Sequence, residues 1–232
     1  MYVLPADGVD EQLDTNGTIS SSIAAIQTWF VGQTRGTRLL RFDTSNGVLD
    51  ITFFRLARTD AEIASFGDFV RDQIELDVKA AGFNDTKKIY AVYYGGGSKV
   101  ACGGGPWPPV LVGNVAALYL RGTPPGARPC ATNPFAKSDK EPGYWEFSLL
   151  HEIFHALGAV ATCAPHHTNA GHVSDDPRDL MYAGNLPWQP SLLDVGNDDY
   201  FNHKNKGCLD IAKSVFIDPT APDAVPPPGW KR

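Results

Sequence analysis

Apolar residues recur at helical spacing near the start of the chain. Between residues 19 and 31 they lie three or four positions apart, which places them on one face of a helix: Ile19, Ile23, Ile26 and Phe30. Asn16 and Thr18 stand just before this run, and both are residue types that cap helix N-termini. The pattern therefore predicts a helix over residues 19–31.

A second helical pattern begins after Thr59. Glu62 follows Thr59 by three residues, which is the spacing of a capping box. The apolar stripe that follows runs to Gly82 and consists of Ile63, Phe66, Phe69, Val70, Ile74 and Val78. We predict one helix over residues 60–81.

Short extended runs separate these helices. Residues 38–42, 49–55, 88–94 and 110–121 are rich in the residue types that favour strands. A turn-forming stretch, residues 43–47, divides the first two runs, and Gly- and Pro-rich loops flank the last one. Residues 1–15 are expected to form an extended lead-in.

A third helix is predicted over residues 144–157, with Gly158 as its stop signal. Beyond Gly158 the chain is rich in Pro, Asp, Asn and Gly, and only residues 198–203 and 208–216 suggest helices. The Pro-rich residues 219–230 are expected to form an extended tail on the surface. We expect a single α/β (α+β) domain spanning residues 1–232, with an upper subdomain of about 18–158 and an irregular lower subdomain of about 159–232.

Composition and charge narrow the class of protein. The 232 residues are 43% hydrophobic and 20% charged, which is typical of a globular chain with its own core. The net charge of −6 and the absence of a Lys/Arg cluster argue against a nucleic-acid partner. No apolar run reaches the length of roughly 18–20 residues that a membrane helix requires. Residues 1–17 lack an export-signal pattern, so we expect that any such signal has been removed.

The chain has four cysteines and no CxxC spacing. An even number of cysteines in Gly/Pro-rich segments fits two disulfides in an exported protein, although four free thiols in a cytosolic protein remain an alternative. Of the three possible pairings we favour Cys102–Cys130 and Cys163–Cys208, because each joins neighbours in sequence. We therefore expect a secreted, extracellular monomer.

The third predicted helix carries the most informative residues of the chain. His151 and His155 are four positions apart, so on a helix both imidazoles lie on one face and can bind one metal ion. Zinc favours imidazole ligands, and a catalytic zinc has three protein ligands and one open position. Glu152 can then act as general base toward a water that the metal activates. Two buried histidines on a core helix are the alternative without a metal.

The third ligand cannot be a glutamate, because none follows Glu152 in the sequence. The remaining candidates are the downstream histidines and aspartates. The aspartates also include a group of oxygen ligands of the kind that calcium prefers, but their spacing matches no defined loop: Asp175, Asp176, Asp179, Asp194, Asp198 and Asp199. Solvated turns and helix caps are the better explanation of that group.

Residues 151–158 resemble the HExxHxxGxxH pattern of the metzincin clan of zinc peptidases. Residues 179–182, Asp-Leu-Met-Tyr, resemble the methionine turn of that clan, with Met181 under the zinc ligands. The resemblance implies a metzincin-like catalytic domain that binds an extended substrate antiparallel to an edge strand, for which we expect residues 110–120. Tyr182 is one position too early for the tyrosine that stabilises the intermediate in some members, so it receives no role.

One position departs from the clan. Its third histidine would fall at residue 161, which is Ala161 here. We expect the ligand to come later in the loop, with His172 as first choice because Gly171 precedes it and an extended stretch follows. His166 is the second choice because it lies nearest the usual distance, and Asp175 is the third because some related secreted enzymes use an aspartate.

These observations predict a zinc-dependent endopeptidase that hydrolyses protein or peptide substrates. His151, His155 and His172 would hold Zn²⁺, and Glu152 would be the catalytic base. One alternative keeps the zinc but acts as an exopeptidase or a dedicated processing enzyme. The other is a degenerate zincin that serves as a non-catalytic binding module, a reading that rests on Ala161.

Overall fold

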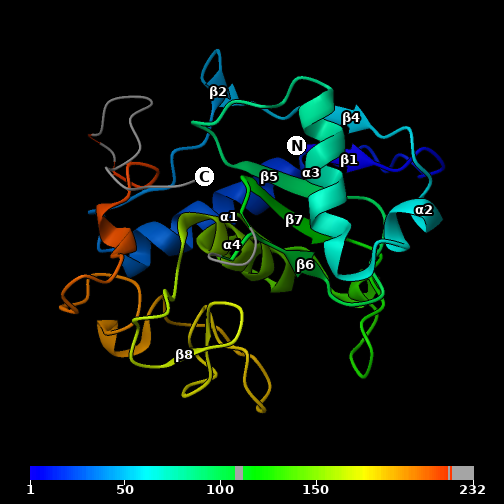
Figure 1. Cartoon of the computed structure of the whole chain (residues 1–232). Helices are drawn as coiled ribbons and strands as arrows, with labels where there is room; N and C mark the ends of the chain where they lie inside the picture. Colours follow the sequence, from blue (N-terminus) through cyan, green and yellow to red (C-terminus); the bar gives the residue numbers. More distant parts are fainter. Residues whose placement is uncertain (108–111, 219, 221–232) are drawn as a thin grey trace.

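The fold is built around one mixed five-stranded sheet. A computed structural model describes residues 1–107, 112–218 and 220. The strand order is β4 (Phe53–Arg55), β1 (Tyr2–Leu4), β5 (Tyr90–Tyr94), β7 (Val115–Tyr119) and β6 (Gly103–Gly104). Neighbouring strands are parallel except β6, which runs antiparallel to β7 at the edge (Figure 1). The expected mixed α/β class is confirmed.

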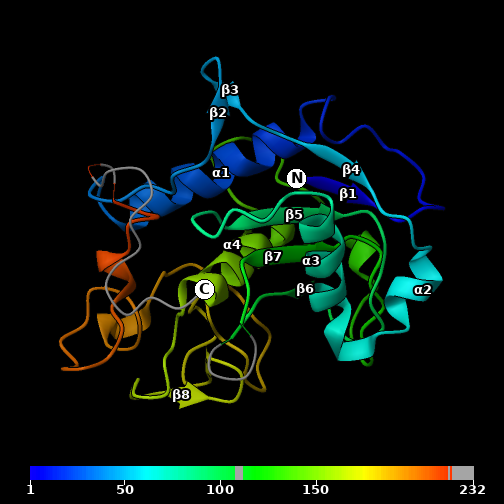
Figure 2. The ribbon, with the colours of Figure 1, turned by 45° about the horizontal axis from the view of Figure 1, so that its top comes forward.

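Helices cover both faces of this sheet. Successive residues of β7 point to opposite faces, so Val115, Ala117 and Tyr119 join the buried cluster of α3 (Val70–Ala80). Ala116 and Leu118 join the larger cluster on the other face, which includes α1 (Thr18–Gln33) and α4 (Tyr144–Leu157). Figure 2 shows α3 on one side of the sheet and α1 and α4 on the other. Helix α4 therefore lies directly behind the central strands.

The predicted helices at residues 19–31 and 144–157 are confirmed. The N-cap of α1 is Gly17 rather than the expected Asn16 or Thr18, and it has no side-chain cap, although the Asn16 side chain accepts a hydrogen bond from the Thr18 backbone N–H (2.9 Å) just before the helix. Helix α4 begins after Gly143 and ends at Gly158, whose φ of +87° is the left-handed conformation that favours glycine.

The single helix expected over residues 60–81 is wrong. The chain instead forms α2 (Asp60–Ala64), the 3-10 turn η1 (Gly67–Phe69) and α3. Thr59 caps α2 through the predicted capping box with Glu62. Gly67, at a φ of +60°, breaks the helical path, so Phe66 and Phe69 leave the buried stripe and are 39% and 58% exposed.

Three strand predictions need correction. Residues 38–42 form no strand of the sheet, because the Leu39 and Arg41 N–H groups donate to the carbonyls of Ile217 and Phe216. The run at 49–55 divides between β3 (Val48–Leu49), which pairs with β2 (Thr44–Ser45) across the predicted turn, and β4. Residues 110–120 were expected at the edge. Of these, 110 and 111 lie outside the described residues, and the rest include β7, which has a partner on both sides. The edge strand next to β7 is β6.

The lead-in also has a larger role than expected. Residues 2–4 form β1, which lies inside the sheet between β4 and β5 and is almost fully buried. The sheet thus includes residues before position 18, where we expected the upper subdomain to begin. Three residues are too few for a periodic pattern, so this strand could not be recognised from the sequence.

The lower half, residues 159–218, has no α-helix among the described residues. It contains a short hairpin of β8 (His167–Thr168) and β9 (His172–Val173) and two 3-10 turns, η3 (Val195–Asn197) and η4 (Ile211–Lys213). The helices predicted at 198–203 and 208–216 are wrong. The Tyr200 and Phe201 N–H groups donate to the buried Asp194 carboxylate (2.9 and 2.6 Å) rather than to helical carbonyls.

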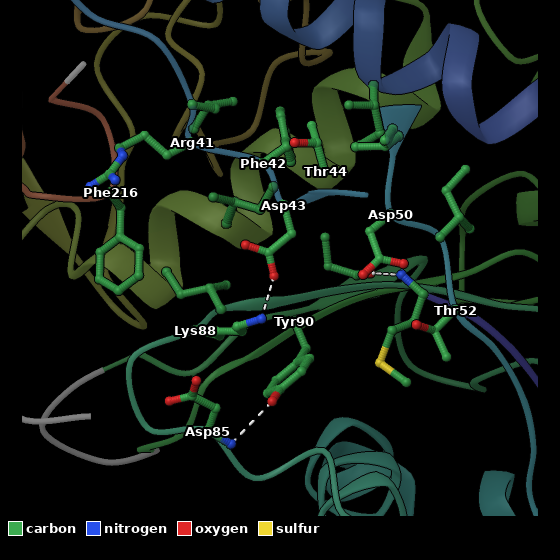
Figure 3. A pocket seen from close by; sticks show the side chains of 18 of the residues that line it. Arg41, Phe42, Asp43, Thr44, Asp50, Thr52, Asp85, Lys88, Tyr90 and Phe216 are labelled. Carbon is green, nitrogen blue, oxygen red and sulfur yellow. Dashed lines mark hydrogen bonds and ion pairs between the residues drawn. The ribbon is translucent and has the colours of Figure 1, made fainter. Parts of the chain in front are cut away.

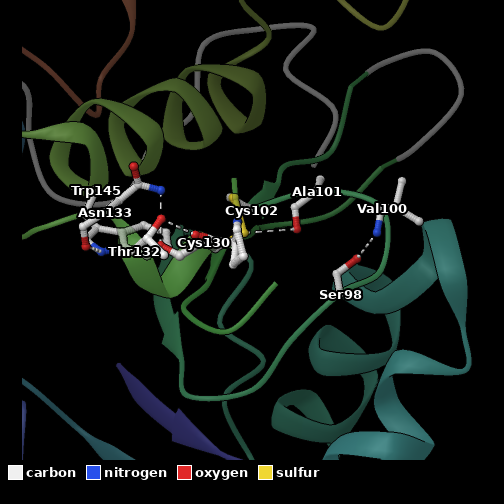
Figure 4. The surroundings of a disulfide bond; sticks show 9 residues. Ser98, Val100, Ala101, Cys102, Cys130, Thr132, Asn133 and Trp145 are labelled. Carbon is white, nitrogen blue, oxygen red and sulfur yellow. Dashed lines mark hydrogen bonds between the residues drawn. A yellow bond between two sulfur atoms is a disulfide. The ribbon is translucent and has the colours of Figure 1, made fainter. Parts of the chain in front are cut away.

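Two disulfides have the predicted pairing. Cys163–Cys208 links two loops of the lower half. Cys102–Cys130 ties the start of β6 to the 3-10 turn η2 (Cys130–Thr132), and Asn133 just beyond it accepts a hydrogen bond from Trp145 of α4 at 2.9 Å (Figure 4). The Cys102–Cys130 disulfide therefore connects the edge strand β6, through η2 and Asn133, to the first turn of α4. The surface tail expected at residues 219–230 lies outside the described residues, apart from Thr220.

Candidate metal centre

Helix α4 presents two different faces. Its apolar side chains point into the core and consist of Trp145, Leu149, Leu150, Ile153, Phe154 and Leu157. Residues 151, 152 and 155 share the opposite face, because positions three and four apart on a helix lie together and residue 155 follows the other two at these spacings. At its start the Glu146 carboxylate accepts hydrogen bonds from the Gly143 N–H (2.9 Å) and the Ala136 N–H (3.0 Å), which fixes the first turn.

Three imidazoles converge beside this helix. The Nε2 atom of His151 lies 3.0 Å from that of His155 and 3.1 Å from that of His172, and the latter two are 3.1 Å apart. The structure thus brings together the three histidines that we predicted as ligands, and it identifies them as a group that could hold a metal ion.

The hydrogen bonds of the other ring nitrogens define what these Nε2 atoms offer. His151 Nδ1 lies 2.7 Å from the Leu180 carbonyl and His172 Nδ1 lies 3.0 Å from the Asn169 carbonyl. A carbonyl only accepts, so both Nδ1 atoms carry the proton and both Nε2 atoms of the neutral rings are lone-pair donors. Two such lone pairs facing each other repel unless a cation lies between them. This second-sphere pattern is typical of metal-binding histidines.

Burial keeps these rings neutral. It lowers the pKa of His151 to about 3 and, with the neighbouring imidazoles, lowers the pKa of His155 well below its ordinary value. The pKa of His172 is lowered as well, mainly by burial. All three rings are therefore in the form that binds a metal at neutral pH. The Nδ1 atom of His155 is buried and has no hydrogen-bond partner among the described residues.

The β8–β9 hairpin delivers His172. Its tight connection uses Ala170 and Gly171, both with positive φ, and Gly171 passes close to the end of α4. A Cβ atom on Gly171 would lie 3.3 Å from the Ala159 carbonyl oxygen. The glycine before His172, which favoured this residue in the sequence, thus permits the close approach. From β9 the chain continues toward Met181, whose carbonyl accepts a hydrogen bond from the Val173 N–H (3.1 Å).

The other candidate ligands lie elsewhere. His166 contacts the Asp199 carboxylate (3.0 Å), and an oxygen of Asp175 lies 3.8 Å from the same ring nitrogen. Neither residue belongs to the three-histidine group. The arrangement therefore groups His172, rather than His166 or Asp175, with His151 and His155. The third imidazole of the group comes from a residue beyond Ala161.

Glu152 stands beside the histidines on α4, against the edge of the sheet. A Cβ atom on Gly103 would lie 2.6 Å from Glu152 Oε1, and one on Gly105 would lie 2.7 Å from both the Glu152 carbonyl oxygen and His155 Cβ. These glycines let the edge strand lie against the helix. Burial raises the pKa of Glu152 to about 8, although the Arg71 guanidinium opposes the shift. The run of glycines at 103–105 was a sequence signal for this close contact, which we did not use.

Residues 179–182, which we predicted as a methionine turn, contact His151 through the Leu180 carbonyl. Met181 is fully buried, and its N–H donates to Asp179 Oδ1 (2.7 Å), which also accepts from the Tyr200 hydroxyl (2.9 Å). The Val195 N–H donates to Asp179 Oδ2 (2.8 Å), so Asp179 fixes the turn that offers the Leu180 carbonyl to His151.

Trp188 is a further contact that the sequence did not reveal. Its ring lies edge-on to His151 with centroids 5.7 Å apart, while its Nε1–H donates to the Asp179 carbonyl (3.1 Å). Tyr182, which received no role, accepts a hydrogen bond from the Leu186 N–H through its hydroxyl (2.9 Å).

A cavity of about 830 Å³ lies on the opposite side of α4 (Figure 3). Ile153 and Leu157 of α4 form part of its wall, and the ion pair of Lys88 with Asp43 lies within it. Its described lining includes neither Glu152 nor any of the three histidines. It is therefore separate from the metal centre.

The chain matches no protein-family model, no curated protein and no solved structure. In the described part of the chain, every helix is too short or too polar to cross a membrane. The case for function therefore rests on the site itself.

Proposed function

We propose that this protein is a secreted, monomeric zinc-dependent endopeptidase of the metzincin type, with one catalytic domain divided at Gly158 into an upper and a lower half. The observation that carries the proposal is the convergence of the Nε2 atoms of His151, His155 and His172 beside the carboxylate of Glu152. Three protein ligands with a neighbouring carboxylate are typical of catalytic rather than structural zinc sites.

The donor set fits zinc. Three nitrogens at roughly 2.0–2.1 Å from a tetrahedral ion are about 3.3 Å apart, and the three Nε2 atoms are 3.0–3.1 Å apart. Imidazole ligands suit zinc better than calcium or magnesium, which prefer oxygen. When bound, zinc supplies a Lewis acid that polarises a peptide carbonyl and makes water more acidic.

The residues of this chain supply the remaining chemistry. Glu152 accepts a proton from the attacking water at a carboxylate oxygen and then transfers it to the leaving amine. The burial that raises its pKa favours its protonated form between these two transfers. Among the described residues β6 is an edge strand and lies beside Glu152, so an extended peptide can pair with its outer side through backbone hydrogen bonds in any sequence context.

Two further observations support an extracellular peptidase. Both pairs of cysteines form disulfides, which persist in oxidising compartments. His172 takes the place that Ala161 leaves open, so the degenerate binding module loses the sequence feature that suggested it.

Cleavage of unfolded casein by the purified full chain tests the proposal. Glu152→Gln removes the base but keeps nearly the same shape, and we expect it to lower kcat by a factor of about 10² or more while zinc remains bound. Glu141→Gln, an exposed carboxylate just before α4, is the matched control and should keep full activity. Zinc content is measured by mass spectrometry on all three proteins.

Mass spectrometry of the products separates the peptidase classes. Internal fragments support an endopeptidase, whereas release of single residues from one end supports the exopeptidase alternative. An inactive wild-type protein that holds zinc would contradict a general endopeptidase, and a protein without zinc would contradict the site itself.

A further inference from the structure

A second group of metal-binding side chains lies in the lower half. It contains His166, Asp198 and Asp199, each of which offers a ligand atom within 4.8 Å of the others. Asp199 Oδ2 lies 3.0 Å from His166 Nδ1, and oxygens of Asp175 and Asp198 lie 3.8 and 4.0 Å from the same nitrogen. An imidazole and two carboxylates from two separate segments therefore face one point, and Asp175 lies at the edge of this group.

The charges of this group are not balanced by Lys or Arg. Within the described ranges, the only side chain in ion-pair distance of Asp175, Asp198 or Asp199 is His166. Asp199 is 1% exposed, so its charge is removed from solvent. Its Oδ1 accepts the His166 backbone N–H (2.8 Å), which leaves Oδ2 to face the centre of the group.

A protonated His166 does not satisfy the group by itself. An Nδ1–H can donate to one acceptor at good geometry, and here Asp199 Oδ2 occupies that position. The other two carboxylates are too far from Nδ1 for a hydrogen bond.

We propose that His166, Asp175, Asp198 and Asp199 bind a second divalent cation of the zinc class, separate from the three-histidine centre. The imidazole in the donor set favours zinc over calcium, and one nitrogen with carboxylate oxygens completes a four-coordinate zinc site. Calcium, which the acidic residues alone suggested in the sequence, prefers an all-oxygen shell.

The position of this cation gives it a structural task. Residues 158–175 follow α4 and include His172 of the first centre. The Cys163–Cys208 disulfide and the backbone hydrogen bonds of His166 to Asp199 and of Val173 to Met181 tie them to the rest of the lower half. A cation bridging His166 and Asp175 to Asp198 and Asp199 would close this loop at both of its ends. It would thus hold the hairpin that presents His172, whether or not the protein hydrolyses peptides.

The test is the zinc content of the untagged full chain after loading with Zn²⁺ in the presence of excess Ca²⁺ and removal of free metal. We expect about two equivalents in the wild type and about one in His166→Ala and in Asp198→Asn. His172→Ala should also hold about one, because it loses the other ion. Asp176→Asn is the matched control next to Asp175; its carboxylate pairs with Arg178, and it should keep about two.

The combinations of variants make the outcome decisive. A double variant of His166→Ala with His172→Ala should hold almost no zinc, which assigns one ion to each group. One equivalent in the wild type that disappears only with His172→Ala would overturn the second site and leave the first intact. Two equivalents that survive both His166→Ala and Asp198→Asn would place the second ion elsewhere and also overturn the proposal.

A thermal melt supplies a readout independent of activity. Zinc loading should raise the Tm of His172→Ala, which retains only the second site, because an ion that binds the folded state stabilises it. An unchanged Tm in that variant would contradict a structural cation, whatever the result of the peptidase assay.

Discussion

The two halves of this protein are held together by different means. The upper half, drawn from blue to green in Figure 1, has regular helices on both faces of a sheet, and its core is set by periodic apolar residues. The lower half, in yellow to red, has almost no regular structure and depends on buried carboxylates, a disulfide and short turns. Yet one cluster of buried side chains includes residues of both, such as Phe30 and Met181.

The candidate metal centre lies between the upper half and the lower half. Helix α4 of the upper half contributes His151 and His155, whereas the hairpin of the lower half contributes His172. The upper half thus provides two histidines whose relative position depends only on the helix, and the lower half provides the histidine whose position depends on tertiary contacts. Disturbing one half should therefore affect the site in a different way from disturbing the other.

The largest difference should come from the disulfides. Replacing both Cys163 and Cys208 with alanine opens a link across 45 residues of sequence, and we expect the free energy of unfolding to fall by about 2–5 kcal/mol. Because this disulfide anchors the loop that carries His172, zinc affinity should fall by about tenfold. Urea unfolding and zinc titration under non-reducing conditions measure both quantities.

The matched comparison is the pair Cys102 and Cys130, also replaced with alanine, which spans 28 residues. Chain entropy predicts a similar loss of stability. This link reaches α4 through Trp145 in the first turn, ahead of His151 and His155, so zinc affinity should stay within about twofold. Equal losses of zinc affinity in the two double variants would show that the halves do not act separately on the site.

The next effect concerns the buried carboxylate under the metal centre. Asp179→Ala leaves the donors Met181 N–H, Val195 N–H and Tyr200 hydroxyl without an acceptor. We expect a loss of about 2–4 kcal/mol in unfolding free energy, together with weaker zinc binding because the Leu180 carbonyl is no longer fixed. Asp139→Ala, an exposed residue of the upper half, is the control and should change stability by less than about 0.5 kcal/mol. A neutral Asp179→Ala would refute the role given to this side chain.

A smaller effect is expected at the junction of the halves. Gly158→Ala forces a side chain into a φ of +87° and places its Cβ 2.8 Å from Leu209 Cδ2. The expected loss is about 1–2 kcal/mol, measured by urea unfolding. Gly126→Ala has a similar φ of +73° but meets nothing within 4 Å, so it should lose only about 1 kcal/mol. If the unfolding free energy of both variants falls by the same amount, the close approach of the added Cβ to Leu209 has no energetic cost.

The smallest effect is local to the upper half and depends on pH. Hydrogen bonds from the Thr59 backbone N–H and hydroxyl lower the pKa of Glu62 below its ordinary value of 4.5. A lowered folded-state pKa means that the stabilisation is present above pH 4.5 and is lost as the pH falls through the folded pKa. Glu62→Gln keeps the shape but not the charge, so the wild type should be slightly more stable at pH 6 and the difference should vanish near pH 3. A difference that grows toward low pH would have the wrong sign for this capping box.

Much of the upper half could be predicted because its signals are local. The helix of residues 144–157, its end at Gly158 and the capping box at Thr59 each depend on a few neighbouring residues. The break at Gly67 and the short strand at residues 2–4 could not be predicted in this way. The first depends on a single backbone conformation, and the second depends on partners about 50 and 90 residues away.

The lower half was predicted mainly through single residues. His172 and the pair Cys163–Cys208 lie where their residue types suggested, whereas neither expected helix forms. In this half Asp194 and Asp210 accept the backbone N–H groups of Tyr200, Asn202 and Ala212, which a helix would otherwise use. Side chains that replace helical hydrogen bonds leave no periodic pattern in a sequence.

The sequence alone determined the two histidines and the glutamate on one helical face, because helical geometry fixes the relation of residues three and four apart. It also determined where that helix ends, and it favoured the observed pairing of the cysteines without deciding it. Only the tertiary structure decided that His172 completes the group, that β6 rather than β7 forms the edge, and that Gly103 and Gly105 press against Glu152. These three features are contacts between segments far apart in the chain, and their energies depend on a packing that no local pattern encodes.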